Sequence, residues 1–590
     1  MPGNLYRQLR TLLLSRHGEA MASLLAAVLT VLCDSFFRLN DIHALFWLLP
    51  HVGQAKFYGA LILAFLQTAA IFYVIAQFPR IARLILIPVM GLVVMVQMSY
   101  FLTLGHYMFS DDLSTAITLG MDYTREAVVS FFNPMVILYA IPSLLGASIL
   151  LVVPYRFRLA RQLGVTSMAT LFLIVSNYAF FVKAQEQYFH LNPLASLIRT
   201  ALYSQFQAML DYRGPRDELP ELAANGKPAD SIIYIIDESI RGSNLSLNGY
   251  SRLTTPFLQS LEADGRLKNL GIGVAASTYS SITNAYLISG HNVFPDKELR
   301  TAKNPTLFDY AGKMGYRTVF IDVNESYLTS RARENKENSI RAVDLWMTVE
   351  SFRARGLETG ANTDITVARF IADLLNHSGG YFIIVNKKGL HYSYRNKFPD
   401  EPAYRIWEPM MELNEAIATS APGREKLVNT YDNGVRFVVD KFFQELVGTI
   451  KNQNYMILYT SDHGQTLSEN GQIYTHAQPD EVIVDVPAFF IVGQRYEKAK
   501  MISAIAKGIR VSHLNNFATL LDLMAAPRSW RMHSYDKSIF HLTPEDNQTR
   551  FYLSGSLHGW GGNYVIGKIP TPPPRGWGAS QPVARARIFN

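Results

Sequence analysis

Asp462 and His463 are residues of a kind that binds metal ions, and they stand where an apolar, β-rich run ends. That run covers residues 455–462, and a second imidazole, His476, follows after a short loop. Carboxylate oxygens and neutral imidazole nitrogens are ligands of zinc, and a catalytic zinc keeps one coordination position for a substrate or a nucleophile. A single Asp-His pair is also common in ordinary turns, so a metal site needs further ligands.

Glu238 is a further candidate ligand, because it follows another apolar run, residues 231–237. A carboxylate at the end of such a run loses its hydration unless it is paired or binds a metal. The alternative interpretation is a salt bridge between Glu238 and the nearby Arg241. The sequence alone leaves both open.

A segment rich in small and hydroxyl residues, 273–290, lies between these candidate ligands. It could present a Ser or Thr at a helix N-terminus, where backbone N–H groups and the helix dipole stabilise an anion. A hydroxyl on a metal becomes a nucleophile because the metal lowers its pKa. Residue types do not choose among the hydroxyls, and an ordinary Ser/Thr-rich loop is the alternative. The candidates are Ser277, Thr278, Ser280, Ser281 and Thr283.

Short β-rich runs alternate with helical patterns after residue 230. The helical patterns include residues 255–264 and 425–451. The runs predicted as strands are 231–237, 316–322, 380–386, 455–462 and 486–492. This alternation predicts parallel strands with crossover helices, an α/β domain, in which chemistry gathers at the carboxyl ends of the strands.

Long apolar runs fill the first part of the chain. The protein has 590 residues, 49% of them hydrophobic, and a mean hydropathy of +0.07, but the apolar residues are concentrated before residue 185. Five runs approach the ~20 residues that a membrane crossing needs. They cover residues 18–37, 57–78, 84–105, 130–153 and 165–184. We therefore expect a five-helix transmembrane domain, with buried helices of a soluble core as the alternative.

Arginines at alternate ends of these runs predict the orientation. The clusters at 7–16, 80–83 and 156–161 fall on one side, and short basic loops face the cytoplasm. An odd number of spans then places the rest of the chain outside, in the periplasm of a Gram-negative cell. The predicted domains are a transmembrane domain (1–185), interfacial helices and a linker (186–230), a catalytic domain (231–565) and a Pro-rich tail (566–590).

Charge and cysteine content exclude several classes of site. The net charge of +7 is dispersed and partly explained by topology, so no nucleic-acid partner is expected. The one cysteine, Cys33, lies in the first apolar run, which excludes an intrachain disulfide and any thiol-based site in the soluble part.

Residues 237–258 ("DESIRGSNLSLNGYSRLTTPFL") resemble the signature of membrane phosphoethanolamine transferases. In that family a Gly-Glu-Ser/Thr-x-Arg run leads to Leu-x-Gly-Tyr-x-Arg-x-Thr-x-Pro. Residues 429–443, 461–476 and, less closely, 387–399 are similar to the same family. Members of that family also have five membrane spans followed by a periplasmic domain of the alkaline phosphatase or sulfatase type. The resemblance covers nearly the whole chain.

The resemblance implies a role for each candidate residue. Zinc would be the cofactor, held by Glu238, Asp462 and His463. The family's nucleophile would fall on Thr278, which would also bind the metal. The two histidines that hold the substrate phosphate would be His391 and His476.

Further substrate contacts are implied at Glu126, Asn324 and Arg331, with Arg333 as an alternative to Arg331. The chain departs from the family at Asp237, which replaces the usual glycine, and in its lack of disulfides. The loop before His476 is one residue longer, and the family's lysine is missing after Asp322.

The implied reaction moves phosphoethanolamine from phosphatidylethanolamine to an envelope acceptor through a phospho-threonine. Lipid A or the lipopolysaccharide core is the expected acceptor, and the enzyme is expected to be an inner-membrane monomer. The alternatives are a phosphoglycerol transferase, a transferase acting on a periplasmic glucan or protein, and a non-catalytic membrane sensor or scaffold. A sulfatase would need a Cys/Ser-x-Pro-x-Arg motif, which the sequence lacks.

Overall fold

The structure is a computed structural model that describes much of the chain. The described residues are 11, 13–15, 17–37, 51–104, 107–108, 134–155, 159–183, 193–210, 212, 214–220, 228–324, 340–411, 421–469, 476, 478–530, 535–546, 549–555, 557 and 564–570. They form two compact units that divide between Leu210 and Asp211.

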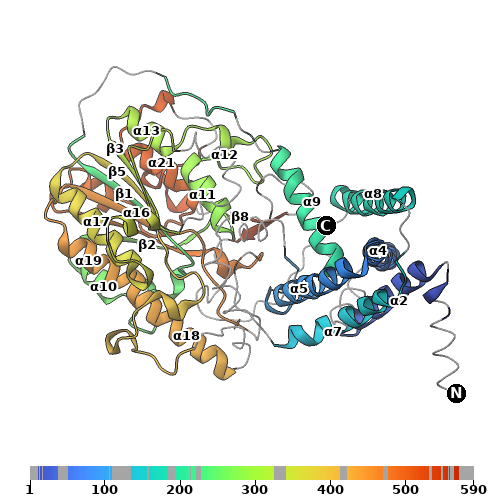
Figure 1. Ribbon diagram of the computed structural model, residues 1–590. Helices are drawn as coiled ribbons and strands as arrows, with labels where there is room; N and C mark the ends of the chain where they lie inside the picture. Colours follow the sequence, from blue (N-terminus) through green and yellow to red (C-terminus); the bar gives the residue numbers. More distant parts are fainter. Residues whose placement is uncertain are drawn as a thin grey trace. The chain divides into compact units, whose positions relative to one another are not determined.

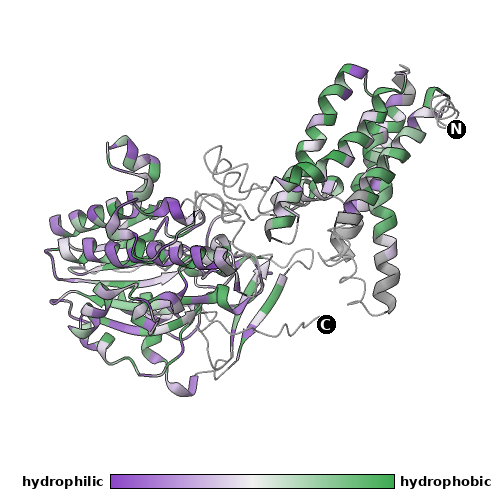
Figure 2. Cartoon of the chain, turned by 90° about the horizontal axis from the view of Figure 1, so that it is seen from below, coloured by the Kyte–Doolittle hydropathy of each residue, from purple (hydrophilic) through white to green (hydrophobic). Residues whose placement is uncertain are grey.

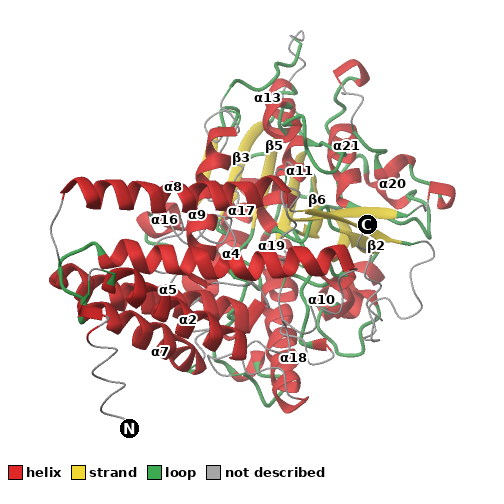
Figure 3. Ribbon diagram, turned by 90° about the vertical axis from the view of Figure 1, so that its right-hand side faces the viewer, coloured by secondary structure: helices red, strands yellow, loops and turns green. Residues whose placement is uncertain are grey.

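The described part of the first unit is helical (Figure 3), and most described residues of each of the five predicted apolar runs lie on a helix. The helices are α2 (Gly18–Phe37), α4 (His51–Ala76), α5 (Arg80–Leu104), α7 (Met135–Ser148), α8 (Leu159–Lys183) and α9 (Pro193–Leu210). Hydrophobic residues dominate them (Figure 2). Within the described residues, one helical stretch, Arg80–Leu102, is both long and apolar enough to cross a membrane. The arrangement of five spans therefore stays a prediction.

Arg83 is buried in this unit and holds the ends of two helical segments. Its guanidinium donates to the carbonyls of Ala76 (2.6 Å) and Phe78 (2.7 Å), where α4 ends. It also donates to Leu150 (2.5 Å) and Val153 (2.8 Å), after α7. The last carbonyls of a helix have no partner within the helix, so one arginine satisfies two such ends.

The second unit is built on a seven-stranded sheet with the order β2-β7-β6-β1-β5-β3-β4. The strands are β1 (Ser231–Asp237), β2 (Leu267–Val274), β3 (Arg317–Asp322), β4 (Leu345–Thr348), β5 (Tyr381–Asn386), β6 (Tyr455–Ser461) and β7 (Asp485–Val492). The five predicted strands are confirmed. Strands β6, β1, β5 and β3 run parallel to one another, as expected, and β4, which was not predicted, pairs parallel with β3.

Strand β7 corrects one expectation, because it runs antiparallel to β6 and not parallel to it. Among the described residues between β6 and β7, the chain forms no α-helix before it returns beside β6. Strand β2 pairs antiparallel with β7 and was not predicted. Its sequence ("LKNLGIGV") carries Lys, Asn and two Gly, and most of it is only half buried, so it lacks a clear strand pattern.

Helices cover both faces of the sheet (Figure 1). Helices α11 (Ser280–Ser289), α13 (Leu307–Lys313) and α21 (His513–Leu523) lie on one side. Helices α10 (Pro256–Ala263), α16 (Val349–Ala354), α17 (Thr363–His377) and α19 (Phe442–Thr449) lie on the other. The predicted helix 425–451 is α18 (Ala421–Val435), a π-helical segment (Arg436–Lys441) and α19.

A two-stranded antiparallel hairpin completes the unit. It consists of β8 (Arg550–Gly555) and β9 (Tyr564–Ile569), so β9 extends into the segment predicted as a tail. Leu553 of β8 forms an isolated parallel bridge with Ser277, which precedes α11. The hairpin therefore supports the hydroxyl-rich segment.

Candidate active site

Strand register brings the carboxyl ends of β1 and β6 together. Asp237, the last residue of β1, pairs with Ser461, the last residue of β6. The pairing extends one step further, because Asp462 N–H donates to the Asp237 carbonyl at 2.8 Å. Glu238 and Asp462 therefore leave two neighbouring parallel strands side by side, although they are far apart in sequence.

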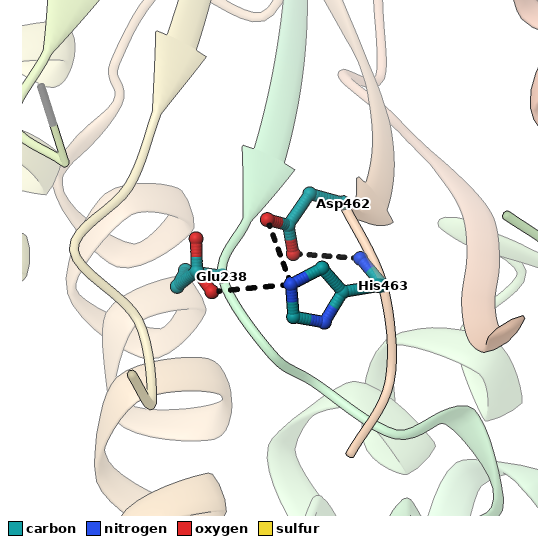
Figure 4. A group of neighbouring side chains, drawn as sticks. All are labelled: Glu238, Asp462 and His463. Atoms are coloured by element: carbon teal, nitrogen blue, oxygen red, sulfur yellow. Dashed lines mark hydrogen bonds and ion pairs between the residues drawn. The ribbon is translucent and has the colours of Figure 1, made fainter. Parts of the chain in front are cut away.

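Glu238, Asp462 and His463 form one buried cluster (Figure 4). One ligand atom from each lies within 4.8 Å of the others, and all three residues are buried. His463 Nε2 lies 3.6 Å from Glu238 Oε1 and 3.6 Å from Asp462 Oδ2. The structure thus brings together the three residues that the resemblance assigns to the metal.

Neighbouring bonds orient these side chains toward a common point. His463 Nδ1 donates to the Gly464 carbonyl at 2.7 Å, which leaves Nε2 as the nitrogen with the lone pair. Ser239 donates its hydroxyl to Glu238 Oε1 (2.6 Å) and its N–H to Asp462 Oδ1 (2.9 Å). Asp462 Oδ2 is a buried oxygen with no hydrogen-bond partner among the described residues. Two carboxylates and one imidazole with free lone pairs fit a zinc ion.

Burial sets the electrostatics of the cluster. Burial, and then the Asp462 carboxylate, raise the pKa of Glu238 to about 7. Burial also raises the pKa of Asp462 and lowers the pKa of His463. All three shifts express the cost of placing charge in a site without water, and a bound cation would offset the cost for both carboxylates.

Arg241 does not serve as the partner of Glu238. Its guanidinium lies 2.5 Å from Glu469 and donates to Ser243 at 2.8 Å. The salt-bridge interpretation of Glu238 is therefore replaced by a carboxylate that faces Asp462 and His463.

Of the five candidate hydroxyls in the segment 273–290, Ser280 is the one with a hydrogen bond to the cluster. Its Oγ donates to Glu238 Oε2 at 3.1 Å and lies 3.2 Å from His463 Nε2. It is the first residue of α11, where backbone N–H groups favour an anion.

Thr278, the predicted nucleophile, bonds to the hairpin in this structure, and its role stays a prediction. Its hydroxyl donates to Ser554 Oγ at 2.9 Å, and its N–H donates to the Leu553 carbonyl at 3.1 Å. Pairing with β8 turns Thr278 toward the hairpin. Ser280, two residues later, is the first residue of α11 and faces the cluster.

His513 is a site residue that the sequence analysis missed. Its Nδ1 accepts the Ala276 N–H at 3.2 Å, so its Nε2–H faces Thr460 Oγ1 at 2.9 Å. Burial lowers the pKa of His513 to about 3, which keeps the ring neutral in this role. It ties the segment before Ser280 to the end of β6. Nothing in its local sequence indicates this role.

His391 and His476 lie beside the cluster. The His476 ring stacks on His463 with centroids 4.6 Å apart, and the His391 centroid is 5.6 Å from that of His476. Tyr392, which was not predicted, has its ring 5.7 Å from that of His476. Burial, and then His463 and His391, hold the pKa of His476 well below its usual value.

Of the three predicted substrate contacts, the structure describes one. Asn324 Nδ2 donates to Glu238 Oε2 at 2.5 Å, so Asn324 reaches the cluster directly. Glu126 and Arg331, with the alternative Arg333, lie outside the described residues.

Comparisons with known proteins agree with this fold. Residues 230–526, half of the chain, match the sulfatase family. The chain is 27% identical over 316 residues to phosphoethanolamine transferase EptA of Escherichia coli O157:H7, covering 51% of this chain. That match spans 54% of the relative's own length. It is 25% identical over 457 residues to phosphatidylethanolamine transferase Mcr-1 of Escherichia coli, covering 69% of this chain and 77% of that one.

The structure is similar to that of the integral membrane protein lipooligosaccharide phosphoethanolamine transferase A from Neisseria meningitidis. The TM-score is 0.62 at 18% identity, covering 88% of this chain and 97% of that one. This likeness extends the shared fold beyond the α/β unit. The match over residues 230–526 shows that the chain belongs to the sulfatase family.

Proposed function

We propose that this protein transfers phosphoethanolamine from phosphatidylethanolamine to an acceptor in the bacterial envelope. The observation that carries the proposal is the position of the Ser280 hydroxyl, 3.1 Å from Glu238 and 3.2 Å from His463 Nε2. A hydroxyl beside three buried zinc-type ligands suits a covalent phosphoryl-transfer mechanism. The relatives named phosphoethanolamine or phosphatidylethanolamine transferases indicate the headgroup.

Glu238, Asp462 and His463 would hold the zinc ion, as the resemblance implies. When bound there, zinc would lower the pKa of a neighbouring hydroxyl and offset negative charge on a phosphate. The residues around it do the rest. Ser239 holds both carboxylates in place, and the Gly464 carbonyl fixes the His463 tautomer.

The first step forms a bond between Ser280 Oγ and the phosphorus of phosphatidylethanolamine. The bond from phosphorus to the diacylglycerol oxygen breaks, and the lipid leaves as diacylglycerol. The Ser280 proton passes to water, and a histidine of the pair His391 and His476 donates a proton to the leaving oxygen. N–H groups at the start of α11 lie where negative charge develops.

The second step returns Ser280 to its free form. An acceptor oxygen attacks the phosphorus of phosphoserine, its proton passes to the basic histidine, and the Ser280 Oγ–P bond breaks. Ser280 then regains a proton from water. Lipid A or the lipopolysaccharide core is the proposed acceptor, and the proposed location is the inner membrane with the second unit in the periplasm.

The test compares Ser280→Ala with Thr278→Ala in the full chain. Ser280→Ala should lower headgroup transfer by about 10³-fold or more, as the loss of a nucleophile does. Thr278→Ala should keep much of the activity, since its hydroxyl only supports the hairpin. Transfer is followed by mass spectrometry of lipid A and of diacylglycerol release.

Three donors separate the alternatives in this assay: phosphatidylethanolamine, phosphatidylglycerol and an aryl sulfate. Turnover of phosphatidylglycerol or of the sulfate in place of phosphatidylethanolamine would contradict the proposed headgroup. Trapping of phosphoethanolamine on Thr278, found by peptide mass spectrometry, would contradict the role of Ser280.

A further inference from the structure

Lys387 carries a fully buried ammonium group directly behind the candidate active site, at the end of β5. Its Nζ lies 2.6 Å from Asp237 Oδ2 and 3.6 Å from Asp364 Oδ2. It also donates to the Val438 carbonyl at 2.5 Å and lies 4.1 Å from the centroid of the Phe442 ring. A lysine is almost never this deeply buried unless it is paired, so the group has a specific place in the fold.

Each of the two carboxylates holds the backbone of a different turn. Asp237 Oδ1 accepts the N–H of Glu238 at 3.0 Å. Asp364 accepts the N–H groups of Lys388 and Gly389, both at 3.1 Å. The Lys387 ammonium thus joins the carboxylate that orients Glu238 to the carboxylate that orients the turn before His391.

The two turns also touch directly. Leu390 N–H donates to the Glu238 carbonyl at 2.9 Å, and Lys387 N–H donates to the Ile236 carbonyl at 2.9 Å. Gly389 packs so closely that a Cβ atom there would lie 2.5 Å from Asp237 Oδ1 and 2.6 Å from the Glu238 carbonyl oxygen. A shift of either turn would therefore move the other.

The third partner of Lys387 is the Val438 carbonyl, which belongs to an irregular helical segment. Val438 lies in the π-helical segment Arg436–Lys441, between α18 and α19. Segments of this kind are rare and are often found at functional sites. The ammonium is therefore held from the sheet, from α17 through Asp364, and from this helix.

We propose that Lys387 and Asp237 are positioning residues whose ion pair sets the places of Glu238 and His391 together. The metal-binding carboxylate and the phosphate-binding histidine would keep their separation because one buried cation links the turns that carry them. The roles given to Glu238 and His391 rest on the proposed function. The placement of the two turns does not.

The first experiment measures zinc affinity of the full chain in detergent, by competition with a chromophoric chelator. Asp237→Asn and Lys387→Met should each weaken zinc binding by about 10–100-fold, as the loss of an outer partner of a metal ligand does. The double variant should lose less than the product of the two single losses, because both variants break one interaction.

Asp296→Asn is the matched control. Asp296 is also fully buried and accepts two backbone N–H groups, from Arg300 and Thr301, both at 2.7 Å. Its loss should lower the melting temperature without changing zinc affinity. If zinc affinity fell only because the protein is less stable, it would fall equally in Asp296→Asn. If it falls because Glu238 is displaced, it should fall only in Asp237→Asn and Lys387→Met.

The second experiment needs neither metal nor turnover. Hydrogen exchange of the metal-free full chain should be faster at the amides of Glu238 and Leu390 in Asp237→Asn and Lys387→Met, but not in Asp296→Asn. Wild-type exchange at both amides in both variants would overturn the proposal, as would wild-type zinc affinity in both. If exchange and zinc affinity change as expected but the wild type transfers no headgroup, the proposed function fails while the positioning role stands.

Discussion

At the scale of single residues, Ser280 and Thr278 differ in what surrounds them and not in their chemistry. Both are hydroxyl residues in one short segment. Thr278 faces Ser554 of the hairpin, and Ser280 faces Glu238 and His463. The pairing of residues 276–278 with β8 turns one hydroxyl away, and the start of α11 turns the other toward the cluster. The position of Ser280 is therefore the ground on which we propose it as the nucleophile.

Zinc should stabilise the protein more strongly as the pH rises toward about 7. Burial and the Asp462 carboxylate raise the Glu238 pKa from 4.5 to about 7. In the metal-free protein, the stability that goes with the protonated carboxyl is present at low pH and is lost as the pH rises through about 7. The deprotonated carboxylate is the form that binds metal, so the gain from zinc should rise over the same range.

The measurement is the melting temperature with zinc minus that with a chelator, from about pH 5.5 to about pH 8. Glu238→Gln removes the titrating group and is the control, and its gain from zinc should be small and flat over this range. An equal gain at both ends of the range in the wild-type protein would show that Glu238 does not compete for protons in this way.

At the scale of elements, the site is made by turns that follow four parallel strands. Glu238 follows β1, Asp462 and His463 follow β6, Asn324 follows β3, and His391 follows β5. Their side chains meet because carboxyl ends of parallel strands share one edge of the sheet. The turns must also pack on one another, so a position where two turns touch has room only for a small residue.

Gly389→Ala should destabilise the protein more than Gly265→Ala. Both glycines have a positive φ, +50° and +71°, so each alanine pays about 1–2 kcal/mol for left-handed backbone. A Cβ at Gly265 would meet nothing within 4 Å, whereas one at Gly389 would strike Asp237 and Glu238. Overpacking should cost Gly389→Ala about 1–3 kcal/mol more.

Denaturant unfolding followed by tryptophan fluorescence measures this difference, with Gly265→Ala as the reference. Zinc affinity should fall in Gly389→Ala and stay unchanged in Gly265→Ala, since only the first alanine disturbs Glu238. Equal stabilities for the two variants would contradict this prediction, because they would mean that the turn after β5 shifts to accommodate a Cβ atom at little cost.

At the scale of the whole molecule, the chain joins a helical, apolar unit to an α/β unit that carries the candidate active site. The predicted orientation follows from arginines at alternate ends of the apolar runs. Arg83 adds a structural use for one of these charges, because it satisfies carbonyls at the ends of two helical segments.

Cysteine labelling tests this orientation in intact cells. Cys33 is the only cysteine, so a Cys33→Ser background carries no thiol. In that background, Ser260→Cys on exposed surface of the second unit should react with a membrane-impermeant maleimide added outside spheroplasts. Phe78→Cys, between α4 and α5, should react only after permeabilisation. The reverse pattern would place the catalytic unit in the cytoplasm.

The sequence by itself determined the elements and the types of residue at their ends. Local patterns of apolar residues predicted five strands and the helical character of the first unit. They also showed that potential metal ligands follow β1 and β6. Such patterns are visible because a buried strand or helix needs apolar residues at fixed spacing.

Only the tertiary structure decided which groups meet. Three side-chain contacts join residues that are far apart in sequence. The separations are 183 residues for Ser280 and His463, 276 for Thr278 and Ser554, and 150 for Lys387 and Asp237. The antiparallel direction of β7, the pairing of Arg241 with Glu469 and the role of His513 are decided in the same way. These choices depend on contacts between distant segments, which leave no periodic trace in the residues themselves.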